Sequence, residues 1–306
     1  KGTIYAERNL IGYLDGLQSF TYQDIRDFYH KWYRPDYQAV VVVGDIDVDK
    51  VEQKIKTIMA DIPAPAADAA KKDVIVVPDN AEPIVSVNAD PEMQQSNLMI
   101  FYKSQAMPKE RNNTMMYELL NIMKSYISRM MNERLSDIAR KPNAPFIQAN
   151  FSPAGGFGIC PTLEVTSGQV ITQDGKILEG YKALLTEMER MRRHGFTEGE
   201  WERAKNNILS SLENQYKSRD DRRHSDYANM CIANFSDGTP LYDAETEYQL
   251  DKQIVEMISC DMINATVKQM YKPLENVVIV ANTPAKDGVA IPTEAELVEA
   301  LKAAVA

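Results

Sequence analysis

Histidine is the side chain on which zinc binding and acid–base chemistry near neutral pH most often depend. This sequence has only three, His30, His194 and His224. A zinc peptidase presents two imidazoles to one metal from a helix that carries H-E-x-x-H or H-x-x-E-H. None of the three histidines stands in either pattern. We therefore predict that each histidine is a structural or surface residue and that the chain supplies no metal ligand.

The cysteine and serine residues give equally weak evidence for a nucleophilic active site. The three cysteines, Cys160, Cys231 and Cys260, are widely spaced and form no C-x-x-C, so neither a disulfide framework nor a zinc knuckle is indicated. The strained G-x-S-x-G turn of a serine hydrolase does not occur. A Ser-His-Asp or Cys-His site assembled from distant residues stays open. The residues alone predict no catalytic residue, no cofactor-binding residue and no metal site.

Alternating acids at Asp45, Asp47 and Asp49 suggest a calcium loop. An EF-hand loop that began at Asp45 would need glycine at its sixth position and glutamate at its twelfth. The sequence has Lys50 and Lys56 there. The acids therefore fit better as the favourable negative charges at the start of a helix.

The pair Gly155–Gly156 could cradle a phosphate through its main-chain amides. No G-K-[ST] follows it, and the next residues suggest a strand rather than a helix. We predict a hairpin turn at these glycines.

The segment 217–224 is dense in both signs of charge. We interpret it as a solvated helix face with local ion pairs. An arginine cluster that holds peptide carboxylates is the functional alternative.

The composition excludes two classes of partner. The net charge is −10, so no basic excess is available to displace the counterions of a nucleic acid. The apolar runs are only a few residues long, whereas a membrane span needs roughly 20, so no membrane span is predicted. A chain of 306 residues with 44% hydrophobic and 25% charged residues is typical of a soluble globular protein.

The segment 20–45 occurs twice, since 258–280 repeats its pattern. In the first copy, Thr21 with Asp24 resembles a capping box that starts a helix, and Pro35 ends that helix. The valine run 40–43 then predicts a core strand. The natural explanation of this repeat is that the chain contains the ends of two domains that end alike. The two copies are about one domain length apart. The first domain would begin before Lys1, and the lack of an initiator methionine agrees with a cut or processed chain.

These boundaries predict a domain organisation. Residues 1–62 are expected to be the C-terminal remnant of a first, catalytic-type domain. The proline- and alanine-rich segment 63–78 is expected to be a linker. Residues 79–290 form a complete second, non-catalytic domain, and residues 291–306 form a terminal helix or linker.

The hydrophobic patterns within this second domain predict an α+β fold, a layered antiparallel sheet with helices packed on it. Strands are expected at 74–77, 84–87, 98–102, 146–151, 156–160, 163–165 and 277–280. Long helices are expected at 116–138, where methionines recur every three or four residues, and at 177–191. Further helices are expected from Thr197, over 241–258, and from Thr293.

The repeated unit closely resembles the end of the first domain of pitrilysin/insulinase-type zinc metallopeptidases, the inverzincins. The residues that carry this resemblance are Arg8 to Gly12, Phe20 to Asp24, Phe28 with Tyr29, Trp32 to Pro35, and the run 40–47. The stretch 195–206 resembles part of their second domain. The resemblance implies a homologous domain repeat that covers essentially the whole chain.

In that family the H-x-x-E-H motif and its downstream glutamate ligand precede the region matched here, so no residue of this chain takes their role. The resemblance implies zinc in the parent protein and none bound by this fragment, which alone is expected to be inactive. It further implies a peptide or unfolded polypeptide substrate, an upstream catalytic domain, and a second half that closes a chamber around the peptide.

Three expectations stay open at this point. Residues 1–62 present an exposed sheet edge, which is expected to pair with a second copy or with the second domain. The location is periplasmic or exported by resemblance, with the cytoplasm as the other possibility. A scaffold or peptide-binding subunit that lost its zinc site is the alternative function.

Overall fold

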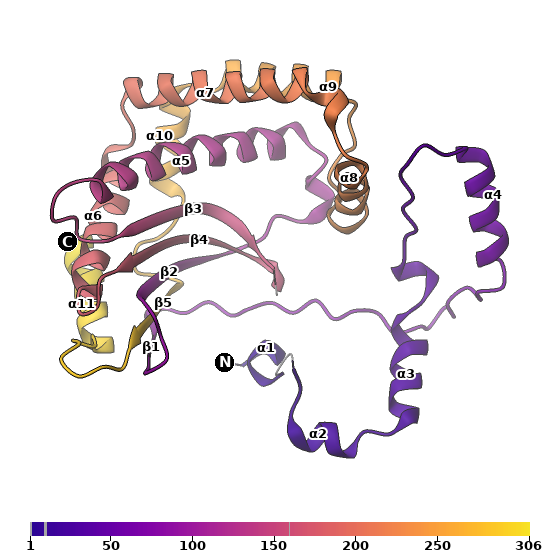
Figure 1. The fold of residues 1–306 in the computed structure, drawn as a ribbon, viewed down its shortest axis with the longest axis horizontal. Helices are drawn as coiled ribbons and strands as arrows, with labels where there is room; N and C mark the ends of the chain where they lie inside the picture. The colour runs from indigo at the N-terminus through magenta and orange to yellow at the C-terminus, as the bar shows by residue number, and fades with distance from the viewer. Residues whose placement is uncertain (1, 9–10, 159) are drawn as a thin grey trace. The chain divides into compact units, whose positions relative to one another are not determined.

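The computed structural model describes residues 2–8, 11–158 and 160–306. The chain divides into two compact units (Figure 1). The first unit contains residues 1–76 and 218–241, and the second contains residues 77–217 and 242–306. No helix in the described ranges is both long and apolar enough to cross a bilayer.

The second unit is built on a five-stranded sheet. Its strands are β1 (Ile84–Asp90), β2 (Ser96–Gln105), β3 (Gln148–Phe157), β4 (Cys160–Thr172) and β5 (Val277–Pro284), in the order β1-β5-β2-β4-β3. All neighbouring strands are antiparallel except β1 and β5, which run parallel. The predicted α+β layered fold is confirmed, with this one parallel pair added.

Strand β2 is central, as its nearly continuous apolar sequence predicts. Side chains on alternate residues are buried on one face, and Leu98 and Ile100 have no exposed surface. This alternation follows from the two-residue period of a strand, which sends successive side chains to opposite faces. One face of the sheet is therefore packed against helices and the other is open.

The helices of the second unit are α5 (Met115–Ala139), α6 (Ile177–His194), α7 (Glu198–Lys217), α9 (Ala244–Met257), α10 (Cys260–Gln269) and α11 (Glu294–Val305), with the short η2 (Lys109–Arg111) before α5. Helices α5, α6 and α11 pack on the sheet, whereas α7 and α9 pack on α5, and α10 packs on α6 and α5 (Figure 1). The methionine stripe of α5 forms core, since Met123, Met130 and Met131 are buried.

The first unit consists of short helices joined by extended chain. They are α1 (Ile4–Glu7), α2 (Leu14–Ser19), α3 (Tyr22–Trp32), η1 (Pro35–Tyr37), α4 (Val48–Met59), η3 (Arg219–Asp221) and α8 (His224–Asp237). The predicted capping box at the start of α3 is confirmed, because Thr21 and Asp24 bond each other's main-chain amides. Asp47 caps α4, which agrees with helix-start acids rather than a calcium loop.

Two predicted strands, 40–43 and 74–77, are wrong, since both segments lie in irregular structure. Val40 and Val42 are about half exposed, and Val74 is 81% exposed. A strand forms only where a neighbouring chain takes up its amides and carbonyls, and no described strand lies beside either segment. Valine content indicates the preference for a strand but does not supply the partner.

The predicted hairpin turn at Gly155–Gly156 is also wrong. Both glycines lie inside β3, next to a register shift between Ser152 and Gly155, and β3 continues to Phe157. Glycine within a strand often marks such an irregularity. The three short strands predicted over 146–165 are instead the two long strands β3 and β4.

Candidate functional site

The three histidines lie on three different helices and all are exposed. His30 is in the last turn of α3, His194 ends α6, and His224 begins α8. In residues 2–8, 11–158 and 160–306, no group of three or more histidine, cysteine or acidic side chains is arranged to hold a metal ion. The side chains in these ranges therefore do not fit a zinc site, and no chemical step through zinc is assigned to them.

The three cysteines lie apart and form no disulfide with one another. Cys160 and Cys260 are buried and Cys231 is half-buried. The Cys260 thiol lies 3.5 Å from the carbonyl oxygen of Phe196, and burial, with added repulsion from Glu198, raises its pKa. A raised pKa disfavours the thiolate that nucleophilic chemistry needs. Cys260 therefore acts as a core residue at the start of α10.

The charged segment 217–224 was predicted to be one helix face, and this prediction is wrong. Helix α7 ends at Lys217, η3 follows, and α8 starts at His224. Local ion pairs are present: Lys217 Nζ lies 2.7 Å from Glu213, and Arg219 Nη2 lies 3.9 Å from Asp220. The helix is interrupted because Ser218 and Arg222 leave the α-helical conformation.

A buried ion pair holds α5 against α7. The guanidinium of Arg134 donates two hydrogen bonds to the Glu200 carboxylate and a third, of 2.9 Å, to the carbonyl oxygen of Gly195. Both charged side chains are 16% exposed. Glu200 also accepts from the amide and hydroxyl of Thr197, the capping pair predicted from the sequence. Burial alone would raise the pKa of Glu200, but these hydrogen bonds outweigh it and lower the pKa to about 2.

The same junction includes α10. The amide side chain of Asn264 accepts from the Phe196 amide at 2.7 Å and donates to the Phe196 carbonyl at 3.0 Å. Gly195 has a φ of +71°, and a Cβ there would lie 2.3 Å from Asn264 Oδ1. The stretch 195–200, which carries part of the family resemblance, is therefore a structural junction between α6, α7, α5 and α10.

The open face of the sheet presents side chains of the second unit in a regular array. Its residues, which we call the open sheet face, are Ile84, Ser86, Asn88, Asp90, Asn97, Met99, Phe101, Lys103, Gln148, Asn150, Ser152, Val165, Ser167, Gln169, Ile171, Val278, Val280 and Asn282. They are exposed or half-buried, whereas the alternating residues on the other face pack against helices. Lys103 and Asp90 are the ionisable side chains among them, and Asp90 is the last residue of β1.

A row of three side-chain amides crosses the open sheet face. Asn88 donates to Asn282 at 3.0 Å, and Asn282 donates to Asn97 at 3.0 Å. The register explains the row, because Asn282 of β5 lies directly opposite Asn88 of β1 and Asn97 of β2. Cross-strand side chains at such positions are close enough to bond.

Apolar side chains occupy the neighbouring row. Met99 lies opposite Val280, Phe101 lies opposite Val278, and Phe101 meets Phe157 edge to face at a ring separation of 6.4 Å. The Lys103 ammonium donates a hydrogen bond of 2.7 Å to the carbonyl oxygen of Pro78, at the margin of the open sheet face. The open sheet face thus combines apolar contacts with neutral hydrogen-bonding groups. Such groups can make apolar contacts and neutral hydrogen bonds.

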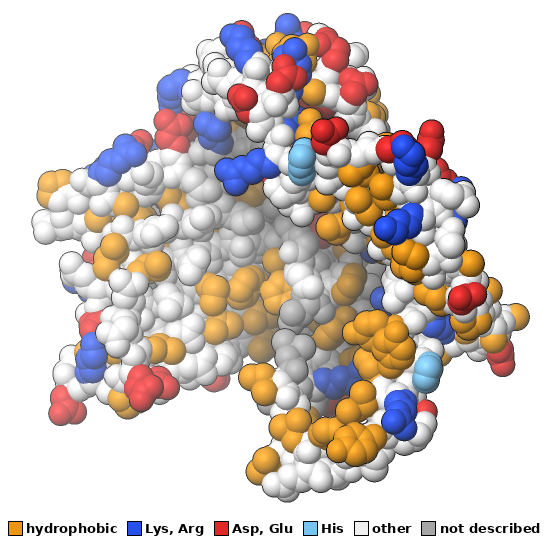
Figure 2. All heavy atoms as spheres, turned by 45° about the vertical axis from the view of Figure 1, so that its right-hand side comes forward, with side chains coloured by type: hydrophobic (Ala, Val, Ile, Leu, Met, Phe, Trp, Pro, Cys, Tyr) orange, Lys and Arg blue, Asp and Glu red, His pale blue; other side chains and the backbone are white. Residues whose placement is uncertain are grey.

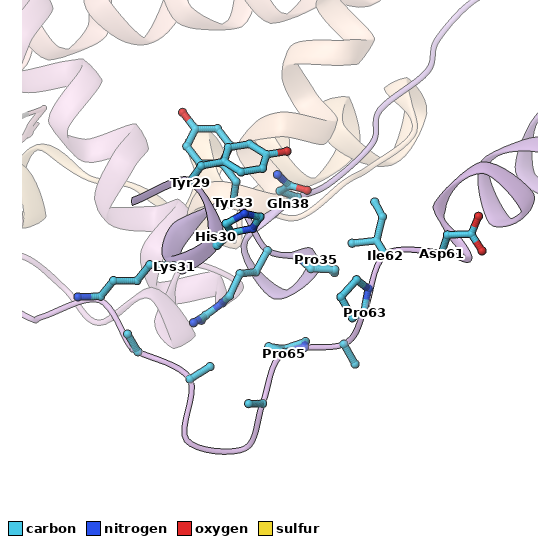
Figure 3. Close-up of a pocket in the computed structure, with 15 residues that line it drawn as sticks. Tyr29, His30, Lys31, Tyr33, Pro35, Gln38, Asp61, Ile62, Pro63 and Pro65 are labelled. Carbon is cyan, nitrogen blue, oxygen red and sulfur yellow. The ribbon is translucent and has the colours of Figure 1, made fainter. Parts of the chain in front are cut away.

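The first unit contains a pocket of about 580 Å³ (Figure 3). Tyr29 and Tyr33 stack on one side of it with ring centroids 5.1 Å apart, and Pro63 and Pro65 come from the linker segment. The Arg34 guanidinium is engaged by Asp36 at 2.8 Å. The pocket therefore offers aromatic and proline surface rather than a paired acid and base.

Hydrophobic side chains remain exposed throughout the first unit. Figure 2 shows hydrophobic side chains gathered in patches at the surface. Ile25 and Phe28, which stand three residues apart on α3, are 53% and 59% exposed. This apolar side of α3 therefore has no fully buried residue.

Sequence reasoning missed the open sheet face. The signal was present, because Asn97, Met99, Phe101 and Lys103 alternate with fully apolar or aromatic residues along β2. Alternation shows that two faces differ. It cannot show that Asn88, Asn97 and Asn282, which are far apart in the sequence, form one row.

Comparison with known proteins identifies the family. Residues 19–208 match the family described as the peptidase M16 inactive domain. Probable zinc protease PqqL of Escherichia coli is 24% identical over 268 residues, which are 87% of this chain and 28% of that protein. Zinc protease PQQL-like of Arabidopsis thaliana is 26% identical over 265 residues, which are 86% of this chain and 24% of that protein.

The fold comparison agrees. The crystal structure of the first half of the periplasmic protease PqqL from Escherichia coli superposes with a TM-score of 0.83 at 20% identity, covering 97% of this chain and 62% of that chain. The chain spans about a quarter of the length of the curated relatives it matches. The resemblance to pitrilysin/insulinase-type zinc metallopeptidases is confirmed. Because the family match covers more than half of its residues, this chain belongs to the M16 peptidase family, and the matched region is the inactive domain of that family.

Proposed function

We propose that this chain is a non-catalytic portion of a zinc-dependent metalloendopeptidase, and that its open sheet face lines the wall of a chamber in which peptides are cleaved. The observation that carries this proposal is the match of residues 19–208 to an inactive peptidase domain. The chemistry of the open sheet face supports it, since apolar and amide side chains suit contact with many peptide sequences.

The domain organisation is part of the proposal. Residues 1–62 would be the end of the first, catalytic-type domain, 63–78 the linker, 79–290 the second domain, and 291–306 a terminal helix. The exposed apolar side of α3 supports this assignment, because an amphipathic helix with an uncovered stripe normally packs against further protein. In the parent protein that further protein would be the upstream catalytic domain.

Cofactor, partners and location follow from the relatives. The matched proteins are named zinc proteases, so the parent of this chain is proposed to bind zinc through residues upstream of the matched region. A second half would close the chamber around a peptide or unfolded polypeptide. One matched structure is a periplasmic protease, which favours an exported location.

The first experiment compares this chain with a chain extended upstream by about one domain, roughly 200 residues. Zinc content and cleavage of a quenched fluorescent peptide are measured for both. We expect zinc and cleavage only in the extended chain. Its matched control replaces the glutamate of the H-x-x-E-H motif with glutamine, which should keep zinc and lose cleavage. An extended chain that binds no zinc and cleaves nothing would contradict the proposal and favour a scaffold or peptide-binding role.

The open sheet face is tested in the active extended chain by Phe101→Glu. A charge in the apolar row should weaken peptide binding and raise KM several-fold, while zinc content and kcat stay near the original values. Glu213→Lys on the exposed side of α7 is the control and should leave KM unchanged. An unchanged KM for Phe101→Glu would remove the open sheet face from the peptide path.

A further inference from the structure

A groove of about 470 Å³ lies between the edge of the sheet and α11. The residues that line it are Pro83, Val85, Glu294, Ala295, Val298, Glu299 and Lys302. Strand β1 is an edge strand of the described sheet, in which β5 is its one neighbour. The β1 edge and the groove face of α11 thus form one surface, which we call the β1–α11 surface.

The main chain of β1 is available for pairing. Proteins usually protect sheet edges with proline, charge or bulges. The other edge strand, β3, carries Pro153 and a register shift after Ser152. Strand β1 pairs with β5 without any shift and has no charged side chain before Asp90. Within the described ranges, no main chain other than β5 bonds that of residues 84–89.

The side chains of β1 also favour an added strand. Val85 and Val87 lie on the helix-covered side of the sheet, where they are half-buried against the core. An adjacent strand would extend this apolar layer and complete the burial of both valines. The β1 edge is therefore regular, uncharged and apolar on its covered side.

The groove face of α11 has a charge pattern that is complementary to itself. Val298 lies at the middle of the stripe, Glu294 lies four residues before it and Lys302 lies four residues after it. Both charged residues are exposed, and neither has an ion-pair partner among the residues that the structure describes. When two such stripes lie antiparallel with their centres together, each Glu294 faces a Lys302, while Glu299, the third charged residue of the groove, stands directly after the central Val298.

We propose that two copies of this chain associate through the β1–α11 surface about a two-fold axis normal to the sheet. Such an axis reverses every direction in the plane of the sheet, so β1 lies antiparallel to β1 of the second copy and α11 lies antiparallel to α11. The two sheets then join into one continuous sheet. Val298 meets Val298 of the second copy in the groove, and Glu294 pairs with Lys302 twice.

A second copy fits this surface better than an unrelated extended peptide. A peptide strand would satisfy the amides and carbonyls of β1 but leave Val298 and the symmetric pair Glu294 and Lys302 of α11 unmatched. A two-fold interface uses the same patch on both partners and therefore needs the self-complementary pattern that α11 carries. This inference rests on the sheet edge and α11 alone, so it holds or fails independently of the proposed function.

The test measures the mass of the full 306-residue chain by sedimentation at rising protein concentration. We expect a species of twice the 34.5 kDa of one chain. Val298→Glu should weaken the association at least tenfold, since it places two like charges in the groove. Lys302→Glu should weaken it as well, and the double variant Glu294→Lys/Lys302→Glu should restore it. Ala303→Glu, an exposed α11 residue that does not line the groove, is the matched control and should associate normally.

Hydrogen exchange gives a second readout that is specific to strand pairing. The amides of residues 84–89 should exchange more slowly in the original chain than in Val298→Glu at the same concentration, while circular dichroism shows both to be equally folded. The inference is overturned if the chain stays monomeric at high micromolar concentration. It is also overturned if association persists unchanged in Val298→Glu, which would place the contact elsewhere, including the edge predicted for residues 1–62.

Discussion

Arg134 and Glu200 connect three helices through one buried pair of charges. Arg134 comes from α5, Glu200 comes from α7, and the Gly195–Phe196 stretch between them is bonded by Asn264 of α10. Removing one charge of a buried pair leaves the other without compensation, which typically costs more than the pair itself contributes. The stability of the second unit should therefore depend strongly on this junction.

We expect Glu200→Gln to lower the free energy of unfolding by about 3 kcal/mol, because the Arg134 guanidinium would stay buried without its carboxylate. Urea denaturation measures the loss. Glu213→Gln, which removes an exposed carboxylate of the same helix, is the control and should change the midpoint little. Equal midpoints for both variants would show that the buried pair contributes nothing net.

The stability lost in Glu200→Gln should depend on pH in a direction that the pKa of Glu200 sets. Glu200 has an ordinary pKa of 4.5, and in the folded chain it is lowered to about 2. A lowered pKa gives stability that is fully present above pH 4.5 and is lost as the pH falls toward 2. The difference between the original chain and Glu200→Gln should therefore shrink over this range. A difference that stays constant from pH 5 to pH 2.5 would contradict the assignment.

For Asp251 of α9 we expect stability to change with pH in the direction opposite to that for Glu200. Burial, with added repulsion from Glu247 and Glu118, raises its pKa from 3.8 to about 6. A carboxyl with a raised pKa destabilises the folded chain above that pKa, and the penalty is relieved as the pH falls from 6 toward 4. Asp251→Asn should raise the free energy of unfolding at pH 7.5 by about 1 to 2 kcal/mol, after allowance for solvent screening.

Thermal melts of Asp251→Asn at pH 7.5 and pH 4 check this expectation. The gain should be present at the first pH and nearly absent at the second. Asp287→Asn, in an exposed loop, is the control and should show no gain at either pH. Destabilisation by Asp251→Asn at pH 7.5 would mean that the charged form makes a favourable contact that outweighs the repulsion.

At the level of elements, the close contact of β4 with α6 depends on Gly168. A Cβ at this position would lie 2.9 Å from Met188 Sδ and 3.0 Å from Leu184 Cδ2, both of α6. Gly168→Ala should therefore force the helix away from the sheet and cost about 1 to 3 kcal/mol. Gly156→Ala in β3 is the matched control, since no atom lies within 4 Å of the added Cβ.

Denaturation of both glycine variants measures the contrast. Gly156→Ala should lie within about 0.5 kcal/mol of the original chain, as is usual for surface substitutions. Two equal losses would indicate a general cost of alanine in these strands rather than the specific approach of α6 to β4.

The element patterns also show where sequence reasoning works. The period of apolar residues placed α5, α6 and the central strand β2 correctly, because each buries one face within the same unit. The same reasoning failed for 40–43 and 74–77, since a strand also needs a partner that local sequence does not specify. Gly155 and Gly156 were misread as a turn because glycine marks both turns and strand irregularities.

At the scale of the whole chain, the segment 61–79 connects elements without regular structure beyond its first residues. Lys71 and Lys72 are exposed there, so trypsin should cut after them before it cuts the helices of the second unit. We expect the fragment that begins at Asp73 to keep a cooperative thermal transition, because the buried core lies in residues 98–301.

Limited proteolysis followed by mass spectrometry and thermal melting of the product checks this expectation. A fragment that melts without cooperativity would show that residues 1–72 contribute to the stability of the second unit. Early cuts inside α5 or α6 would show the same. The retained transition would support the proposal that the two parts of the chain belong to different domains of a larger peptidase.

The sequence by itself determined the family, the α+β class, the capped helices and the absence of an H-x-x-E-H motif, because these depend on local patterns and short motifs. Only the tertiary structure decided which residues meet. It assembled the amide row of Asn88, Asn97 and Asn282, paired Arg134 with Glu200, and left the β1 edge open beside α11. The physical reason is that strand order and helix packing join residues that are distant in the chain, and no periodicity along the sequence records which neighbours they acquire.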